Sequence, residues 1–551
     1  MMWRQLLASR ARGRVFDVLV IGGGIVGASI ARDAALRGLS AALVEQGDFA
    51  SGTSSKTSKL IHGGLRYLEH GHLRLVAESL RERATLRAIA PTLVQPLSLL
   101  LPVYAGDLRP AWQINCGLWL YDLLAGRRNL RPHRMLSRRR ALAMEPGLRA
   151  EGLRGAGLYA DCQMDDARLC LANVLQAASL GAVCLNYTRV QRLLLVGGQA
   201  CGALVEDLLS GQASELQARV LVNAAGPWAD SVRRLSDPNA PARLEPIKGI
   251  HLVLPALARE ALFFRARRDQ RMLFLLPWSG YTLAGTTEGP VSQPLEALAA
   301  AAEEVGYLLD EVNRILPGSH LGEDDIVATF AGARPLLAHG GSATGASREH
   351  RLEVDGAGLI SVLGGKYTTA RAMAQQAVDL VAERLGRRRE RCLTDEISLL
   401  EAPQPVATGY WGDLTRAVDP DLLGRFFTRY GAGTFHLLEL IAHEPGLSQP
   451  VCPHHEVTGA ELVHAVQREF ACTITDALAR RTRMAWSACQ GLDALSRVTD
   501  LVQRFAGLSA DTLEAQAAAY RQFLAQGRQF TRAARREWLD EPRAVRRAPV
   551  A

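Results

Sequence analysis

The chain has 551 residues, of which 48% are hydrophobic, and carries a formal net charge of +8. This length suffices for two or three domains, and the composition is typical of soluble globular proteins. No apolar run reaches the ~20 residues of a membrane-spanning helix. The nine cysteines form no CxxC pair and no metal-ligand spacing, so we expect no metal site and a reducing compartment.

The N-terminal segment predicts a strand, a tight turn, a helix and a second strand. Val15–Ile21 is a β-branched, apolar run, as expected for a strand buried on both faces. Three glycines break the run, and the spacing then predicts a helix over Ile25–Arg37 that ends at Gly38. Leu39–Val44 predicts the next strand.

The turn in this segment carries a dinucleotide-binding fingerprint. Gly22, Gly24 and Gly27 follow the first strand and open the helix, and Glu45 closes the second strand. The first glycine makes the turn, the second lets the backbone approach a pyrophosphate, and the third allows close packing of helix on strand. The helix N-terminus supplies free N–H groups, and the glutamate can accept hydrogen bonds from ribose hydroxyls.

The following segments predict a mixture of helices and strands. A charged helix is expected within residues 60–91, a basic and aromatic segment spans 109–142, and strands alternate with helices over 182–223. Short strands are expected over 247–287, and an amphipathic helix over 298–316.

The last third of the chain begins with a short buried strand over 359–363, after which Gly364 and Gly365 lead into a helix. Composition changes over 386–410, where three consecutive arginines and two prolines indicate a linker. Residues 411–540 predict a separate helical domain.

Two further segments favour FAD over NAD as the dinucleotide. LVNAAGPW (221–228) is similar to the second FAD-contacting segment of the glutathione-reductase-like flavoproteins, which places Gly226 at the cofactor. GLISVLGGKYTTAR (358–371) is similar to the last such segment, where a helix N-terminus faces the pyrimidine end of the flavin.

Four stretches taken together resemble the FAD-dependent, respiratory glycerol-3-phosphate dehydrogenase family. They are IGGGIVGASIARDAALRGL (21–39), TSSKTSKLIHGGLRYLEHG (53–71), DDARL (165–169) and GGKYTTAR (364–371). The chain departs from the family at Glu288, where Asp is usual, and at Tyr367 and Ala370 within the last stretch.

The resemblance implies a mixed α/β fold. We expect a glutathione-reductase-like, FAD-binding Rossmann domain over residues 14–385, with an antiparallel-sheet substrate domain interleaved at roughly 91–155 and 245–330. The helical domain would follow the linker.

The resemblance also implies the reaction and its residues. Oxidation of sn-glycerol 3-phosphate to dihydroxyacetone phosphate would pass a hydride from C2 to flavin N5. Arg66, Tyr67, Arg348 and Lys366 are then expected to bind the phosphate group. Arg334 would stabilise charge at the reacting carbon.

The proton would pass to a histidine, and two histidines are candidates. His62 and His251 are the candidates because an imidazole ordinarily titrates near neutral pH, and one of the two is alternatively a flavin contact or a core residue. Further expected cofactor contacts are Ser54, Ser55, Lys59, Gly364, Gly365 and Thr368.

Lysine usage supports the importance of these stretches. Of the 64 basic residues only four are lysines, namely Lys56, Lys59, Lys248 and Lys366. Three of them lie inside the motif stretches and Lys248 lies three residues before His251, as expected if a compact ammonium is needed at these places.

The expected electron acceptor is membrane quinone, with the enzyme peripheral on the cytoplasmic face of the plasma membrane. The basic charge favours an anionic membrane, which the aromatic segment 109–128 with Trp112, Trp119 and Tyr121 would contact. No nucleic-acid partner is expected, and a homodimer is left open. Alternatives are an oxidase that uses O2, a related amine oxidase, and a non-catalytic FAD-binding scaffold.

Overall fold

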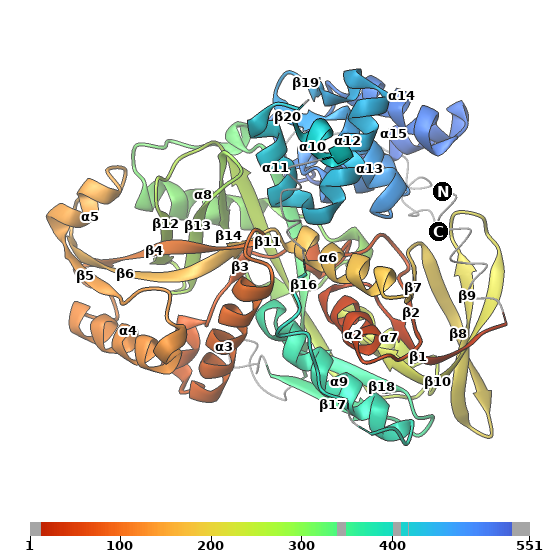
Figure 1. The fold of residues 1–551 in the computed structure, drawn as a ribbon. Coiled ribbons are helices and arrows are strands. Elements are labelled where there is room, and N and C mark those ends of the chain that lie inside the picture. Colours follow the sequence, from red (N-terminus) through yellow and green to blue (C-terminus); the bar gives the residue numbers. More distant parts are fainter. Residues whose placement is uncertain (1–12, 339–348, 389, 400–408, 417, 532–551) are drawn as a thin grey trace, which may run out of the picture.

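The computed structural model describes residues 13–338, 349–388, 390–399, 409–416 and 418–531. Two large sheets lie side by side, and helices of the C-terminal segment cover their junction (Figure 1). The fold is mixed α/β with a C-terminal helical domain, which confirms the expected fold class.

The first sheet contains the predicted N-terminal unit. Its strands run in the order β17-β18-β10-β1-β2-β7, and all neighbours are parallel except β17 with β18. The bounds are β1 Val15–Ile21, β2 Ala41–Val44, β7 Val183–Leu185, β10 Ala213–Asn223, β17 His350–Val354 and β18 Ile360–Gly364. The hairpin of β8 (Thr188–Val196) and β9 (Gln199–Asp207) extends from β10.

Helices cover one face of this sheet. Helices α2 (Ile25–Leu36), α6 (Asp166–Ser179) and α9 (Ala370–Arg384) share an apolar core with its strands. A second apolar cluster, from the other faces of the strands and from the β8–β9 hairpin, covers the opposite side. The parallel strands are therefore buried on both faces, as their continuous apolar runs require.

The second sheet is largely antiparallel. Its path is β15-β11-β14-β13-β12-β4-β6-β3, with β16 beside β11 and β5 beside β6. The bounds are β3 Leu60–Ile61, β4 Val94–Tyr104, β5 Arg134–Ser137, β6 Leu153–Met164, β11 Leu244–Leu254, β12 Ala261–Arg265, β13 Met272–Trp278, β14 Tyr281–Gly285, β15 Gly289–Pro290 and β16 Ala328–Leu337. Helices α3 (Leu73–Ile89), α4 (Ala111–Ala125), α5 (Arg138–Met144) and α8 (Ala302–Ile315) pack around it.

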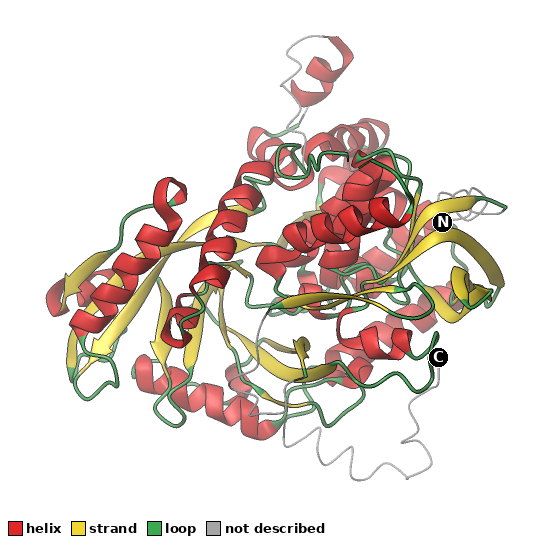
Figure 2. Cartoon of the chain, turned by 90° about the horizontal axis from the view of Figure 1, so that it is seen from below, coloured by secondary structure: helices red, strands yellow, loops and turns green. Residues whose placement is uncertain are grey.

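The C-terminal domain has its own apolar core. Its helices are α10 (Gly409–Arg416), α11 (Pro420–Tyr430), α12 (Thr434–His443), α13 (Gly459–Arg468), α14 (Leu495–Ala506) and α15 (Ala510–Gln526). It also contains a hairpin of β19 (Pro450–Cys452) and β20 (His455–Thr458). Figure 2 shows the whole molecule from below, with helices packed beside the strands of the sheets.

One expected helix is shorter than the sequence pattern indicates. Residues 60–91 begin with strand β3 and a 3-10 turn, and the helix starts only at Leu73, after Gly64 (φ +81°) and Gly71 (φ +73°). A glycine in the left-handed conformation interrupts a regular helix. The spacing of apolar residues did not reveal these two interruptions. Among the described residues, no helix is both long and apolar enough to cross a membrane.

Candidate functional site

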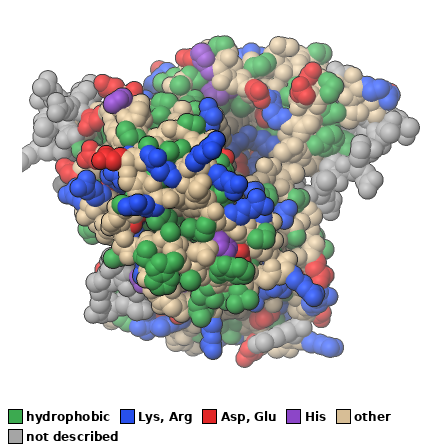
Figure 3. Space-filling view, turned by 90° about the vertical axis from the view of Figure 1, so that its left-hand side faces the viewer, with side chains coloured by type: hydrophobic (Ala, Val, Ile, Leu, Met, Phe, Trp, Pro, Cys, Tyr) green, Lys and Arg blue, Asp and Glu red, His purple; other side chains and the backbone are tan. Residues whose placement is uncertain are grey.

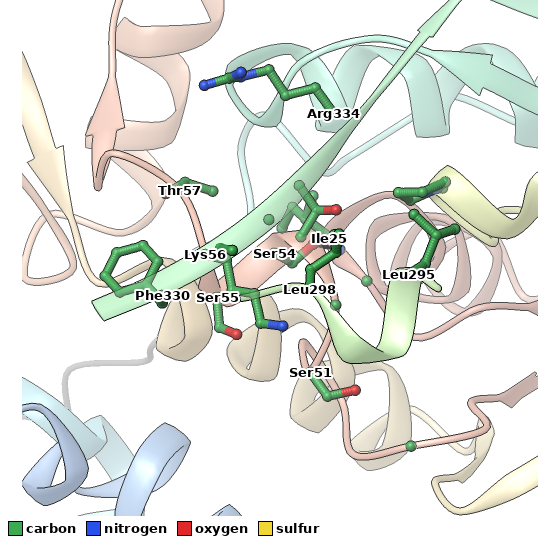
Figure 4. Close-up of a pocket in the computed structure, with 18 of the residues that line it drawn as sticks. Ile25, Ser51, Ser54, Ser55, Lys56, Thr57, Leu295, Leu298, Phe330 and Arg334 are labelled. Carbon is green, nitrogen blue, oxygen red and sulfur yellow. Dashed lines mark hydrogen bonds between the residues drawn. The ribbon is translucent and has the colours of Figure 1, made fainter. Parts of the chain in front are cut away.

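A cavity of about 950 Å³ lies where the two sheets meet the C-terminal domain. It is lined by the glycine turn after β1, by the segment 51–58, by β11 and β16, and by Gly364–Thr368. In Figure 4 the side chains of Ser54, Ser55 and Lys56 lie beside the strand that carries Phe330 and Arg334. The segments that carry motifs in the sequence therefore converge on one space.

The glycine turn has the geometry that the fingerprint predicts. Gly22 has φ +109°, and a Cβ there would lie 2.6 Å from the carbonyl oxygen of Ala224. Gly27 faces the carbonyl oxygen of Gly22, which a Cβ would approach to 1.8 Å, so only glycine permits this packing of helix on strand. The N–H of Ile25 donates to Ser54 Oγ at 2.9 Å.

Glu45 closes this end of the cavity. Its carboxylate accepts hydrogen bonds from the N–H groups of Gly23 at 2.6 Å and Gly47 at 2.8 Å. Burial raises the pKa of Glu45. The side chain is thus held rigidly at the wall where a ribose would bind.

The paired strands β11 and β16 carry two of the predicted catalytic residues on one face. Opposite pairs are His251 with Phe330, Gly249 with Gly332, and Ile247 with Arg334. Directly opposite residues of an antiparallel pair point to the same side, so His251 and Arg334 share a face with glycines between them. A Cβ on Gly249 would lie 2.5 Å from Arg334 Nη2, so the missing side chain makes room for the guanidinium.

His251 is a buried, neutral imidazole. Its Nε2 lies 2.8 Å from Ser58 Oγ, and its ring stacks on Phe330 with centroids 5.0 Å apart. Burial, followed by the charges of Arg334 and Lys59, holds the pKa of His251 well below its usual value. The ring is therefore unprotonated at neutral pH and fixed in orientation.

A second group of predicted residues also lines the cavity. Lys366 Nζ is 4.4 Å from the centre of the Tyr67 ring and donates to Ser79 Oγ at 2.6 Å. The main-chain N–H of His62, a further lining residue, donates to Thr368 Oγ1 at 3.4 Å. The lining therefore includes an ammonium, a phenol and a second imidazole.

Most predicted site residues line the cavity: Gly22, Gly24, Glu45, Ser54, Ser55, His62, Tyr67, Gly226, His251, Arg334, Gly364, Gly365, Lys366 and Thr368. Lys59 does not line it, because its ammonium binds Asp166 at 2.8 Å and the Ser55 carbonyl oxygen at 2.6 Å. The guanidinium of Arg66 lies 3.4 Å from Glu288 and is also outside the lining. Arg348 is outside the described residues.

The cavity also contains residues that sequence reasoning did not place there. Lys56 is a half-buried lining residue, and its partial burial together with the charge of Arg480 lowers the pKa of Lys56 to about 8. The sequence signal that could have indicated Lys56 is that lysine is rare among the basic residues of this chain. Arg480, Trp486 and Gln490 reach the cavity from the C-terminal domain, which carries no recognisable motif.

The lining fits a dinucleotide such as FAD. A glycine turn without Cβ obstruction faces the cavity beside a helix N-terminus, where a pyrophosphate binds, and Glu45 stands at the end of the next strand. Gly364 and Gly365, both with positive φ, also line the cavity, as do the residues up to Thr368 that lead into α9.

Two family models match the chain. Residues 17–380 match the FAD dependent oxidoreductase model, and residues 362–513 match the C-terminal domain of alpha-glycerophosphate oxidase.

Curated relatives and solved structures agree with these matches. The chain is 37% identical to a glycerol-3-phosphate dehydrogenase of Synechocystis sp., covering 93% of this chain and 96% of that protein. It is 34% identical to the aerobic glycerol-3-phosphate dehydrogenase of Staphylococcus haemolyticus, covering 87% and 88%. The glycerol-3-phosphate dehydrogenase from Bacillus halodurans, solved with FAD, superposes with a TM-score of 0.76 at 29% identity, covering 96% and 97%.

Proposed function

Because this chain belongs to the FAD-dependent glycerol-3-phosphate dehydrogenase family, we propose that it oxidises sn-glycerol 3-phosphate to dihydroxyacetone phosphate and delivers the electrons to membrane quinone. The observation that supports this most directly is the placement of His251 and Arg334 on one face of β11 and β16, in a cavity that Lys366 also lines. An alcohol oxidation needs a proton acceptor, a stabiliser of the alkoxide and, for this substrate, a phosphate site.

FAD would be held by the glycine turn, Glu45 and the segment Gly364–Thr368. When bound, the cofactor supplies the acceptor for the hydride that leaves C2 of the substrate. The remaining parts of the reaction fall to side chains of this protein.

We assign the proton to His251 and the alkoxide to Arg334. His251 is neutral, and Ser58 holds the Nε2 atom at which the substrate hydroxyl proton would arrive. Arg334 keeps its charge and is oriented by Thr286 Oγ1 at 2.8 Å, so it stabilises the developing negative oxygen without exchanging a proton. His62, which also lines the cavity, would then position substrate.

The phosphate group would bind at Lys366 and Tyr67. The aromatic ring beside the ammonium and the Ser79 hydroxyl limit the directions in which Lys366 can point. Arg66 would join from the edge of the cavity by leaving Glu288, and Arg348 stays a proposal from sequence alone.

Helix α4 provides a surface for attachment to a membrane. Trp112, Trp119 and Leu123 are 65–75% exposed and follow one another at helical spacing along one face of α4, and Leu108, 64% exposed, precedes the helix. Tyr121, expected on this surface, is instead buried, and its hydroxyl binds Asp161 at 2.8 Å.

The surroundings of this stripe are basic. Exposed arginines follow it in the chain at positions 127, 128, 131, 134 and 138–140. Figure 3 looks onto this side of the molecule, where hydrophobic side chains gather on the lower half and Lys and Arg side chains lie above them. Apolar side chains beside arginines suit a peripheral protein on the anionic cytoplasmic leaflet, where quinone is dissolved.

The experiment that tests the function is anaerobic bleaching of the flavin by a panel of polyols and their phosphates. We expect glycerol 3-phosphate to bleach it at far lower concentration than glycerol, and a short-chain quinone to restore the colour much faster than O2. Equal bleaching by glycerol would contradict the phosphate site. If the protein instead forms stoichiometric hydrogen peroxide and reduces quinone slowly, the electron acceptor is O2 and not quinone.

A further inference from the structure

Three side chains from two separate segments meet at the edge of the C-terminal domain. Cys452 ends β19 and His455 begins β20 of the hairpin at the top of Figure 1, and Cys489 follows 37 residues after Cys452. The two Sγ atoms are 4.0 Å apart, and His455 Nε2 lies 3.2 Å from Cys489 Sγ. All three ligand atoms lie within 4.8 Å of one another.

These separations suit a tetrahedral metal ion. Zinc bonds of ~2.3 Å to sulfur and ~2.0–2.1 Å to nitrogen place two sulfurs about 3.8 Å apart and a sulfur and a nitrogen about 3.5 Å apart. The turn Cys452-Pro453-His454-His455 presents two of the ligands in a C-x2-H arrangement. The main-chain N–H of His454 donates to Cys452 Sγ at 3.4 Å, which would stabilise a thiolate.

We propose that Cys452, His455 and Cys489 form a structural Zn²⁺ site, with water as the fourth ligand. The half-buried positions of His455 and Cys489 leave a side of the site open to that water. Binding would release the two thiol protons to solvent, and the two thiolates would balance the charge of the ion. Residue spacing alone did not reveal the site, because Cys489 is distant in sequence.

The ligand atoms of the three side chains already face one another, with both sulfur atoms and the imidazole nitrogen gathered around one point. The adjacent His454 points elsewhere, toward Asp493 at 3.3 Å on the surface.

The ion would tie the hairpin to a wall of the large cavity. Cys489 lies just beyond Trp486, whose ring contacts Phe330 of β16 with centroids 5.6 Å apart. The N–H of Ala488 donates to the Tyr281 hydroxyl on β14 at 2.9 Å. The metal would therefore stabilise the C-terminal wall without touching substrate.

Equilibrium dialysis of the full chain against Zn²⁺, followed by elemental analysis, tests the site. We expect one zinc per chain, and Co²⁺ in its place should give thiolate-to-metal charge-transfer absorption. Cys489→Ser and His455→Ala should each weaken binding at least about 100-fold, since even losing an outer-shell partner costs roughly 10–100-fold. His454→Ala and the half-buried Cys201→Ser are matched controls that should keep full stoichiometry.

The unsubstituted protein alone can overturn the proposal, whether or not the variants fold. Absence of bound zinc and of the cobalt absorption would do so. A Cys452–Cys489 disulfide in the native chain would also overturn it. Such a disulfide would lower the mass of the chain by two units and the number of free thiols by two. Undiminished zinc in Cys489→Ser would also contradict it.

Discussion

At the scale of single residues, the positions of Arg334 and His251 depend on a glycine that no motif marks. Gly249 lies between them on β11, and a Cβ there would lie 2.5 Å from Arg334 Nη2 and 2.7 Å from Thr286 Oγ1. We expect Gly249→Ala to fold and bind FAD but to displace the guanidinium. A displacement of ~1 Å can cost on the order of 100-fold in rate.

Steady-state kcat and the FAD content of the purified variant check this prediction. Gly289→Ala is the matched control, since no atom lies within 4 Å of a Cβ at that position. An unchanged kcat for Gly249→Ala would remove Arg334 from the proposed mechanism.

Lys366 should determine the preference for a phosphorylated substrate. Removing its ammonium with Lys366→Met removes a charged hydrogen bond worth ~1.5–3 kcal/mol, so KM for glycerol 3-phosphate should rise roughly tenfold or more. Oxidation of free glycerol, which has no phosphate, serves as the internal control and should change little. Equal losses on both substrates would show that Lys366 acts on the cofactor or the fold instead.

The sequence predicted the place of a residue in the site correctly where the geometry permits only one residue type. Gly22 and Gly27 lie against backbone atoms that exclude any Cβ, so the fingerprint predicted their positions. Lys59 was expected at the flavin because it lies inside a motif, but its ammonium is paired with Asp166, which is distant in sequence. A motif gives the chain position of a side chain and leaves its direction undetermined.

At the scale of elements, a buried ion pair joins helix α6 to the C-terminal domain. Arg168 Nη2 lies 2.5 Å from Glu469 Oε1, and both side chains are at most 3% exposed. The charges of Arg168 and then His464 outweigh burial and hold the pKa of Glu469 far below its usual value. Breaking such a pair leaves an uncompensated buried charge.

Arg168→Met should therefore destabilise the protein by about 3–5 kcal/mol near neutral pH. Below about pH 4.5 the unfolded state of the natural protein binds the extra proton, so its stability falls with pH. In the variant, burial without the arginine raises the pKa of Glu469. As the pH falls, the folded variant therefore binds a proton before the unfolded variant does, and its stability rises. The difference in unfolding free energy between the natural protein and the variant should hence narrow as pH falls from 7.5 to 4.5.

Thermal midpoints at both pH values measure this gap. The exposed pair Arg504–Glu444 provides the control, and Arg504→Met should change the midpoint little at either pH. A gap that widens on acidification would contradict the assigned state of Glu469.

Elements with one dominant pattern were predicted within a few residues. Strand β1 has the expected bounds, Val15–Ile21, because its apolar run is continuous and buried on both faces. Within the helical domain expected over residues 411–540, α13 ends at Arg468, and Phe470 has a φ of +62°. A change of backbone direction set by tertiary packing leaves little trace in apolar spacing.

At the scale of the whole molecule, the cavity needs all three parts of the chain. The sequence motifs lie in the first 371 residues, whereas Arg480, Trp486 and Gln490 close the cavity from the C-terminal domain. Their positions depend on how that domain packs on β14 and β16, and contacts between residues so distant in sequence are not encoded in local spacing. The sequence predicted a separate helical domain here but did not predict its part in the site.

The apolar stripe on α4 gives a test of where the whole molecule works. Trp119 and Leu123 are 65% and 75% exposed on one face of the helix, and Arg127 and Arg128 follow at its end. Burial of one large apolar side chain contributes ~1.5–3 kcal/mol. We therefore expect Trp119→Glu with Leu123→Glu to weaken binding to anionic phospholipid vesicles at least about tenfold, while oxidation of glycerol 3-phosphate with a soluble acceptor stays unchanged. Val196→Glu, at a 71% exposed residue of β8 in the other sheet, is the matched control. Cosedimentation with vesicles at low and high salt measures the effect, and full binding by the double variant would move the membrane contact to another face of the protein.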